Sequence, residues 1–395
     1  MTSLHDALTP EVTLPADGTA GTLVGRAWVA GPGGGPCVVA VTTDGVFDLT
    51  GVVPTMADLL NAGDPLAIAR SGGQRLGSIK VLLSNTPYDR RDPGSPWFLT
   101  PVDLQPIKAS GVTFAVSLLE RVIEEQAGGD KTRAESIRQE IMDLIGLDLS
   151  EVEPGSDQAM RLKDHLVSHG FWSQYLEVGI GPDPEVFTKA LPMAAVGTGA
   201  EVGIRRDSSW NNPEPELGLV VSSSGVIVGV TLGNDVNLRD VEGRSALLLG
   251  MAKDNNASAA IGPFIRLLDD TLTLDDVKQV SIQLSVIGED GFTLAGESSM
   301  GEISRDFEEL VTATIGPNHR YPDGLVLLTG TMFAPTQDRD EPGGGFTHKV
   351  GDVVRIGCSE LGTLANRVTY CEEAEPWTFG TAALMRNLAG RGLLN

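Results

Sequence analysis

Three carboxylates in one predicted β-hairpin are the residues of this chain best placed to do chemistry. Glu214 and Glu216 are two residues apart, so on a strand their side chains point to the same side. The apolar runs on either side of 222–225 predict a hairpin that returns the chain to Asp235. With Ser224-Gly225 as the two turn residues, Ser223 pairs with Val226. Asp235 then lies directly opposite Glu214, with their Cβ atoms about 5 Å apart.

This arrangement favours a divalent cation. Three carboxylates that close together cannot all stay ionised without a positive partner, and the hairpin itself contains no Lys or Arg. A site made of carboxylate oxygens suits a hard cation. The alternative is an exposed hairpin with solvated carboxylates, and a turn one residue longer or shorter would move Asp235 to the other face. The residues alone leave both interpretations open.

Composition narrows the classes of partner. The chain has 395 residues, 41% of them hydrophobic and 21% charged, with a formal net charge of −24. This charge argues against nucleic acid or an anionic membrane surface as partner, and it means that an anionic small substrate needs a metal or local cations. Cys37, Cys358 and Cys371 are too few and too scattered for a disulfide framework or a zinc site. The N-terminus lacks the pattern of a signal peptide, and no apolar stretch approaches the roughly 20 residues of a membrane span, so we expect a cytoplasmic protein.

The periodicity predicts an α+β fold that is predominantly β. We expect a small β-rich N-terminal domain at 1–105 and a catalytic domain at 106–395, joined through a proline-rich linker at 85–101. Helical patterns occur at 113–126, 132–145, 157–168 and 382–388. Between 179 and 373 the pattern is mostly that of short strands separated by turns, with no long βα alternation.

Further motifs follow the carboxylates along the chain. They are Pro213-Glu214-Pro215-Glu216-Leu217, Gly233-Asn234-Asp235-Val236, Arg239-Asp240, Lys253, Gly262-Pro263, Leu328-Thr329-Gly330-Thr331 and Val350-Gly351-Asp352-Val353-Val354. Together and in this order they resemble the fumarylacetoacetate hydrolase superfamily. The resemblance implies a mixed β-roll catalytic domain at the C-terminal side of the chain. It also strengthens the interpretation of the carboxylates as metal ligands.

Other segments are similar to one branch of that superfamily, the 2-keto-3-deoxy-D-xylonate or arabinonate dehydratases. They include Gly111-Val112-Thr113-Phe114-Ala115-Val116-Ser117, Pro184-Glu185-Val186-Phe187-Thr188-Lys189, Lys253-Asp254-Asn255-Asn256-Ala257-Ser258 and Gly345-Phe346-Thr347-His348-Lys349. The similarity implies a hydro-lyase of oxidative pentose breakdown that removes water from a five-carbon 2-keto-3-deoxy acid and forms 2-oxoglutarate semialdehyde. It also implies homodimers or homotetramers.

The resemblance assigns roles residue by residue. Glu214, Glu216 and Asp235 become the expected ligands of Mg²⁺, with Mn²⁺ as an alternative. Glu185 is expected to transfer a proton at C3 or at the leaving hydroxide. Lys253 is expected to balance the developing enolate or, with a lowered pKa, to act as the base.

Three further residues are expected to bind substrate. Lys189 and Thr331 match family positions that point into the pocket, and His348 is a candidate general acid because its ordinary pKa lies near neutrality. Each also has a structural alternative: Thr331 as an ordinary strand threonine, His348 as a histidine satisfied by a protein partner.

Two competing functions remain open from the sequence. The same chelation of a 2-keto acid serves an acylpyruvate or diketone hydrolase, or a 2-keto acid decarboxylase, of the same superfamily. No His–Glu pair of the kind that activates water in the carbon–carbon hydrolases is apparent in the sequence, which favours dehydration. A sugar-acid-binding sensor without turnover is disfavoured because both Glu185 and Lys253 are present.

Overall fold

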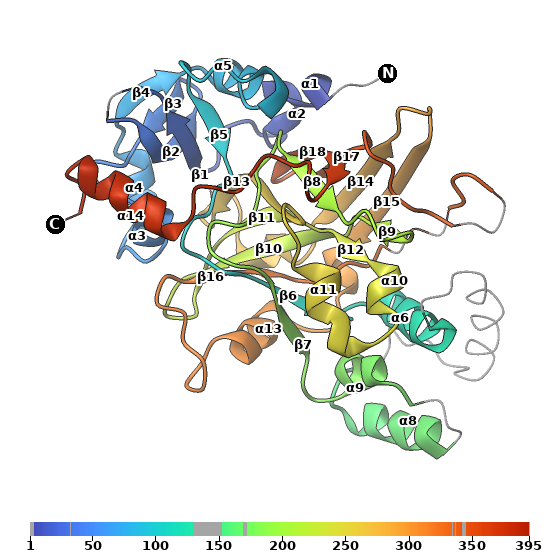
Figure 1. The fold of residues 1–395 in the computed structure, drawn as a ribbon. Helices are drawn as coiled ribbons and strands as arrows, with labels where there is room; N and C mark the ends of the chain where they lie inside the picture. Colours follow the sequence, from blue (N-terminus) through green and yellow to red (C-terminus); the bar gives the residue numbers. More distant parts are fainter. Residues whose placement is uncertain are drawn as a thin grey trace.

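The computed structural model describes residues 4–31, 33–128, 152–168, 172–333, 335, 337–341 and 345–394, and Figure 1 shows its ribbon. The helix predicted at 132–145 lies outside the described residues. In the part of the chain that the structure describes, no helix combines the length and the apolar character that crossing a bilayer requires.

A large mixed sheet forms the centre of the molecule. Its strands are, in order across the sheet, β4 (Gln74–Gly77), β3 (Gly45–Asp48), β2 (Gly35–Thr42), β1 (Leu23–Val29), β13 (Ala259–Leu267), β11 (Ile227–Asp235), β10 (Pro215–Val221), β16 (Leu325–Leu328), β6 (Ile107–Gly111) and β7 (Glu185–Ala190), and β5 (Trp97–Leu99) pairs with β1. Neighbours are antiparallel except β16 and β6. Strands β10 and β11, which carry Glu216 and Asp235, therefore lie in the interior of the sheet, and Glu214 directly precedes β10.

A second sheet packs against this centre. It consists of β15 (Thr293–Ser299), β14 (Ser281–Ile287), β17 (Val353–Cys358), β18 (Gly362–Tyr370) and β8 (Glu201–Ile204). Leu217 and Leu219 of β10 share one apolar cluster with Ile282 and Ile356 of this sheet. Val220 of β10 belongs to a different cluster. Strand β10 is thus buried on both faces, unlike the strand of an exposed hairpin.

Helices surround the sheets (Figure 1). They are α1 (Leu4–Ala7), α2 (Pro10–Thr13), α3 (Met56–Leu60), α4 (Pro65–Arg70), α5 (Ile79–Ser84), α6 (Ala115–Ala127), α8 (Asp157–Ser168), α9 (Gln174–Ile180), α10 (Arg239–Glu242), α11 (Leu249–Lys253), α12 (Leu274–Val277), α13 (Phe307–Thr314) and α14 (Thr381–Gly390), with short 3₁₀ turns η1 (Tyr88–Arg90), η3 (Ala246–Leu248) and η4 (Met300–Glu302). Helix α14 lies beside the N-terminal strands, where the Asn387 amide donates to the carbonyl of Gly34. The C-terminal helix therefore packs on the turn between β1 and β2.

The prediction of a predominantly β fold is confirmed. The helical patterns at 113–126, 157–168 and 382–388 correspond to α6, α8 and α14. Part of the predicted linker at 85–101 forms β5, which pairs with β1, so this stretch is built into the sheet. The boundary near residue 105 stays a prediction, and the large sheet takes strands from both sides of it.

The register of the β10–β11 hairpin agrees with the prediction at its base and differs at its tip. Pro215 pairs with Asn234, and the amide of Asp235 donates to the carbonyl of Glu214 at 3.1 Å, so the two acidic residues do oppose one another. The predicted pairing of Ser223 with Val226 is wrong, because Ser222 donates to the carbonyl of Val226 instead. An irregularity after Val220 absorbs the one-residue difference.

Candidate metal centre

The three predicted carboxylates form one buried cluster. Glu214, Glu216 and Asp235 each offer an oxygen, and these oxygens all lie within 4.8 Å of one another. The side chains are only 1–3% exposed, which rules out the interpretation of solvated carboxylates on an open hairpin. Buried carboxylates at this spacing require compensating positive charge.

The backbone after β16 fixes Glu216. The N–H of Gly330 donates to Glu216 Oε2 at 2.7 Å. Gly330 has a φ of +87°, and a Cβ there would lie 2.2 Å from Thr113 Oγ1. Only glycine can therefore hold this backbone amide toward the carboxylate at this point.

Lys253, at the end of α11, supplies one of the cations. Its Nζ lies 2.5 Å from Glu214 Oε2 and 3.0 Å from Asp235 Oδ2. Burial alone would lower the pKa of Lys253, but Asp235 and Glu214 together raise this pKa well above its usual value. The charged form is thus favoured, which supports charge balance rather than the alternative role as a base.

Lys189, on β7, is completely buried and is held by the protein itself. Its Nζ lies 2.8 Å from Asp235 Oδ1, donates to the carbonyl of Val236 at 2.9 Å and also reaches the carbonyl of Lys253 and the Ser258 hydroxyl. An ammonium group has three donors, and the Val236 and Lys253 carbonyls and the Ser258 hydroxyl take them, while Asp235 lies at ion-pair distance. The geometry therefore favours a role in orienting Asp235, whereas the predicted contact with substrate stays a prediction.

Arg121 and Glu242 complete the ionic network and were not identified from the sequence. Arg121, on α6, contacts Glu214 Oε1 through one guanidinium nitrogen, and its other terminal nitrogen lies 2.8 Å from Glu242 Oε2. The absence of Lys or Arg within the hairpin indicates that the cations come from other elements. Arg121, on the predicted helix at 113–126, is one basic residue that the sequence offers for this role.

Glu185 begins β7 and faces this network. It pairs with Gly111 on β6, and a Cβ at Gly111 would lie 1.9 Å from Glu185 Oε2. The missing side chain of Gly111 thus makes room for the carboxyl group. Burial, reinforced by the negative charge of Glu242, raises the pKa of Glu185 to about 7, although Lys253 and Arg121 act against the rise. A carboxyl with a pKa near neutrality suits proton transfer.

The electrostatics of the carboxylate cluster fit a divalent cation. Burial alone would raise the pKa of Glu214, but Lys253 and Arg121 lower it to about 2. Burial and the charges of Asp235 and Glu214 raise the pKa of Glu216 well above its usual range. Among the described residues Glu216 forms no ion pair, so an added cation would relieve it most. These three residues are the donors that would hold Mg²⁺ or Mn²⁺.

Thr331 lies next to the residue that holds Glu216, whereas His348 is paired with Asp352. Thr331 is one residue beyond Gly330, which holds Glu216, and its hydroxyl accepts from the N–H of Phe333 at 3.1 Å. The buried His348 has its Nδ1 3.1 Å from Asp352 Oδ2, and burial lowers the pKa of His348, which favours the neutral ring. Its Nδ1 thus has the protein partner that the alternative expects, whereas its buried Nε2 has no partner among the described residues. Substrate contact by either Thr331 or His348 stays a prediction.

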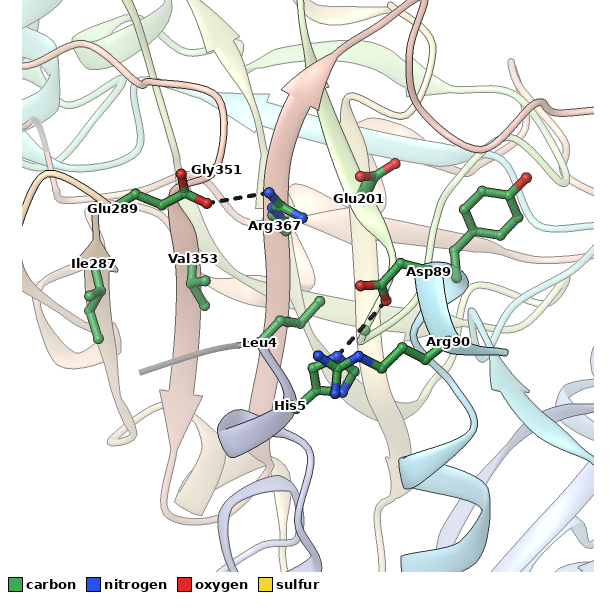
Figure 2. A pocket seen from close by; sticks show the side chains of 13 residues that line it. Leu4, His5, Asp89, Arg90, Glu201, Ile287, Glu289, Gly351, Val353 and Arg367 are labelled. Carbon is green, nitrogen blue, oxygen red and sulfur yellow. Dashed lines mark hydrogen bonds and ion pairs between the residues drawn. The ribbon is translucent and has the colours of Figure 1, made fainter. Parts of the chain in front are cut away.

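A separate cavity of about 430 Å³ lies elsewhere on the molecule (Figure 2). His5 and Asp89 face one another across part of it at 3.9 Å, and Arg367 lies 3.3 Å from Glu289. None of the residues predicted from the sequence to bind metal or substrate lines this cavity. The carboxylate cluster is therefore the candidate site on chemical grounds.

Two curated relatives of this chain carry dehydratase names. A 2-dehydro-3-deoxy-D-arabinonate dehydratase of Saccharolobus solfataricus is 36% identical over 188 residues, covering 47% of this chain and 58% of the relative. A probable 2-keto-3-deoxyxylonate dehydratase of Haloferax volcanii is 35% identical over 195 residues, covering 49% of this chain and 63% of the relative. The matched stretch thus spans about six-tenths of each relative's length.

Solved structures show the same fold. A 2-keto-3-deoxy-D-arabinonate dehydratase complexed with magnesium and 2,5-dioxopentanoate has a TM-score of 0.59 and 24% identity, covering 88% of this chain and 99% of the other. Its apo form has a TM-score of 0.60 at the same identity and coverage. The family model described as fumarylacetoacetate (FAA) hydrolase C-terminal matches residues 163–369, more than half of the chain, and these residues include every predicted catalytic, metal-binding and substrate-binding side chain. The chain therefore belongs to the fumarylacetoacetate hydrolase family.

Proposed function

We propose that this protein is a Mg²⁺-dependent dehydratase that converts 2-keto-3-deoxy-D-xylonate or arabinonate to 2-oxoglutarate semialdehyde and water. The observation that carries the proposal is the buried cluster of Glu214, Glu216 and Asp235, with Glu185 and Lys253 facing it. The names of the two dehydratase relatives support it. The solved dehydratase structure with magnesium supports it too, because the 2,5-dioxopentanoate bound there is the same compound as 2-oxoglutarate semialdehyde, the proposed product.

The proposed reaction balances as follows. A proton leaves C3 and the hydroxide leaves C4, which gives water and an unsaturated keto acid. The C5 carbon and its hydroxyl then each lose a proton, while C3 and C4 each gain one, and C5 becomes an aldehyde. When bound, a divalent cation supplies Lewis-acid polarisation of the C2 carbonyl, which acidifies the C3 protons.

The residues of this chain divide the remaining work. Glu185, with a pKa of about 7, can accept the C3 proton and return it to the departing hydroxide. Lys253 keeps its positive charge beside Glu214 and Asp235, where negative charge develops on an enolate. Lys189 holds Asp235 in place through their ion pair.

The test is turnover by the purified protein with Mg²⁺ and racemic 2-keto-3-deoxypentonate. Formation of 2-oxoglutarate semialdehyde can be followed by NAD⁺-coupled oxidation of the aldehyde to 2-oxoglutarate. We expect turnover that EDTA abolishes and added Mg²⁺ restores. Full activity in EDTA would contradict the proposal.

Parallel assays separate the competing functions. If the protein cleaves an acylpyruvate at a higher rate than it dehydrates the pentonate, it is a hydrolase. If it releases carbon dioxide from oxaloacetate, it is a decarboxylase. Binding of the pentonate without any product would indicate a sensor. The shared carboxylate site is compatible with each, so the product decides.

A further inference from the structure

The pairing of the β10–β11 hairpin continues beyond its acidic residues. In the short ribbon of β9 (Asn211–Asn212) and β12 (Asn237–Leu238), Asn212 pairs with Asn237 in the same register that sets Glu214 opposite Asp235. The two asparagines are thus the pair two residues beyond Glu214 and Asp235, roughly 7 Å along the chain, across short breaks in the strands at 213–214 and at 236. Arg121 contacts both Glu214 and the Glu242 oxygen that accepts from Asn237, so this pair adjoins the carboxylate cluster.

Hydrogen bonds fix which way both amides point. Asn212 Nδ2 donates to the carbonyl of Pro213 at 2.9 Å. Asn237 Nδ2 donates to Glu242 Oε2 at 2.6 Å, and that same oxygen contacts Arg121. Turning either amide over would place oxygen against oxygen. Both Oδ1 atoms are therefore acceptors.

Among the described residues neither amide oxygen has a donor. Asn212 Oδ1 and Asn237 Oδ1 are buried, and their side chains are 3% and 0% exposed. A buried acceptor without a partner destabilises the structure that contains it. Two such acceptors directly opposite one another, beside a metal-binding cluster, indicate a site that is completed by donors from a ligand.

We propose that Asn212 and Asn237 accept hydrogen bonds from the hydroxyl groups of a polyhydroxylated 2-keto acid and select it against acids with an apolar tail. The inference rests on the proposed function, because the neighbouring carboxylates anchor the keto-acid end. The spacing of the two residue pairs matches a five-carbon chain held at one end with its hydroxyls at the other. A neutral amide oxygen accepts from a hydroxyl without adding charge to a site already rich in carboxylates.

The test compares two substrates that both carry a C4 hydroxyl: 2-keto-3-deoxypentonate and 4-hydroxy-2-oxopentanoate, which lacks the C5 hydroxyl. Asn212→Leu and Asn237→Leu remove one acceptor each, and Asn318→Leu makes the same change at an exposed asparagine. We expect kcat/KM for the pentonate to fall about 10- to 100-fold in each site variant, as loss of one buried hydrogen bond predicts. For the analogue, the variant at the asparagine that meets the C5 hydroxyl should lose less than about threefold. The variant at the asparagine that meets the C4 hydroxyl should lose about as much as with the pentonate, and Asn318→Leu should change neither substrate.

An equal loss on both substrates in both variants, or no loss on the pentonate in either, would overturn the inference. So would a parallel loss of Mg²⁺ affinity, measured by calorimetry, because it would assign the amide oxygens to the metal. Asn237 also supports Glu242, so its variant can lose structure. Asn212→Leu breaks only a local bond, so a loss on the pentonate of less than about threefold in this variant would overturn the inference by itself.

Failure of the proposed dehydratase is a separate outcome. If the unmodified protein turns over neither substrate, the affinities of the pentonate and of 2-oxopentanoate at saturating Mg²⁺ take the place of kinetics. The inference then expects tighter binding of the hydroxylated acid, by about tenfold or more, and loss of that difference in Asn212→Leu. Equal affinities in the unmodified protein would refute it.

Discussion

Glu214 and Asp235 oppose one another across the β10–β11 hairpin, and the ammonium group of Lys253 lies against both. The register that brings them together comes from the hairpin, but the cation comes from α11, and a second cation reaches Glu214 from α6. The site is thus assembled from elements that are distant in sequence. Its charges are close to balance only because those elements converge.

Among the described residues, the third carboxylate is the one that forms no ion pair. Glu216 accepts a backbone N–H from Gly330, while Glu214 and Asp235 each have ionic partners. Its pKa is accordingly raised by burial and by its two acidic neighbours. A divalent ion bound at the cluster would favour the ionised form of Glu216.

Glu216→Gln should therefore make the thermal stability of the protein nearly independent of Mg²⁺. In EDTA the variant should unfold at a higher temperature than the unmodified protein, because it removes a poorly compensated buried acid. At a Mg²⁺ concentration of 100 times Kd the unmodified protein should gain about 2.7 kcal/mol, and the variant almost nothing. Thermal unfolding with and without Mg²⁺ measures both, and turnover should be lost as well. A variant that still gains full stability from Mg²⁺ would remove Glu216 from the ligand set.

Lys253→Met should lower the stability of the metal-free protein and make it depend more strongly on Mg²⁺. Without metal, removal of one partner from a buried ionic network leaves Glu214 and Asp235 undercompensated, which typically costs about 3–5 kcal/mol. Mg²⁺ should restore much of this stability because it replaces the missing charge. Turnover should stay absent even at saturating Mg²⁺, since the group proposed to balance the enolate is gone. Denaturant unfolding in EDTA and in Mg²⁺ tests this, and an equal loss of stability in both conditions would contradict it.

Gly111→Ala tests the position of Glu185 without touching its chemistry. The added methyl group would meet Glu185 Oε2 at 1.9 Å, so the carboxyl group must move. Because the colliding atom ends a flexible side chain, stability should change by less than about 1 kcal/mol. Turnover should fall about tenfold or more, since small displacements of a catalytic group are costly. Gly63→Ala is the matched control, because its new methyl group has nothing within 4 Å. Equal activity of the two variants would argue against Glu185 as the proton-transfer group.

The part of this site that the sequence predicts is the part formed by the residues of one hairpin. The alternation of Glu214 and Glu216 and the apolar runs around 222–225 were enough to predict the register at Asp235. The turn itself was misassigned by one residue, because an irregularity after Val220 leaves no mark in the residue pattern. The base of the hairpin was still right since the irregularity and the different turn compensate each other.

The remainder depends on long-range packing. Arg121 reaches Glu214 from a helix that is 93 residues away in sequence, and no local periodicity encodes such a contact. Lys189 looked like a substrate ligand because the resemblance placed it in the pocket, whereas the structure surrounds it with backbone carbonyls and Asp235. Side-chain roles of this kind follow from burial and partners, which only the assembled fold supplies.

The pKa of Glu185 predicts a pH dependence of the metal-free protein. Its pKa in the folded state is about 7, against an ordinary value of 4.5. A raised folded-state pKa contributes stability that is fully present below pH 4.5 and is lost as the pH rises through 7. Glu185→Gln stays neutral throughout, so in EDTA it should match the unmodified protein near pH 4.5 and exceed it above pH 7 by up to about 3 kcal/mol. Denaturant unfolding at both pH values measures the difference. Because the comparison is between two proteins that share every other titrating group, a pH-independent difference would mean that the ionisation of Glu185 is not coupled to folding.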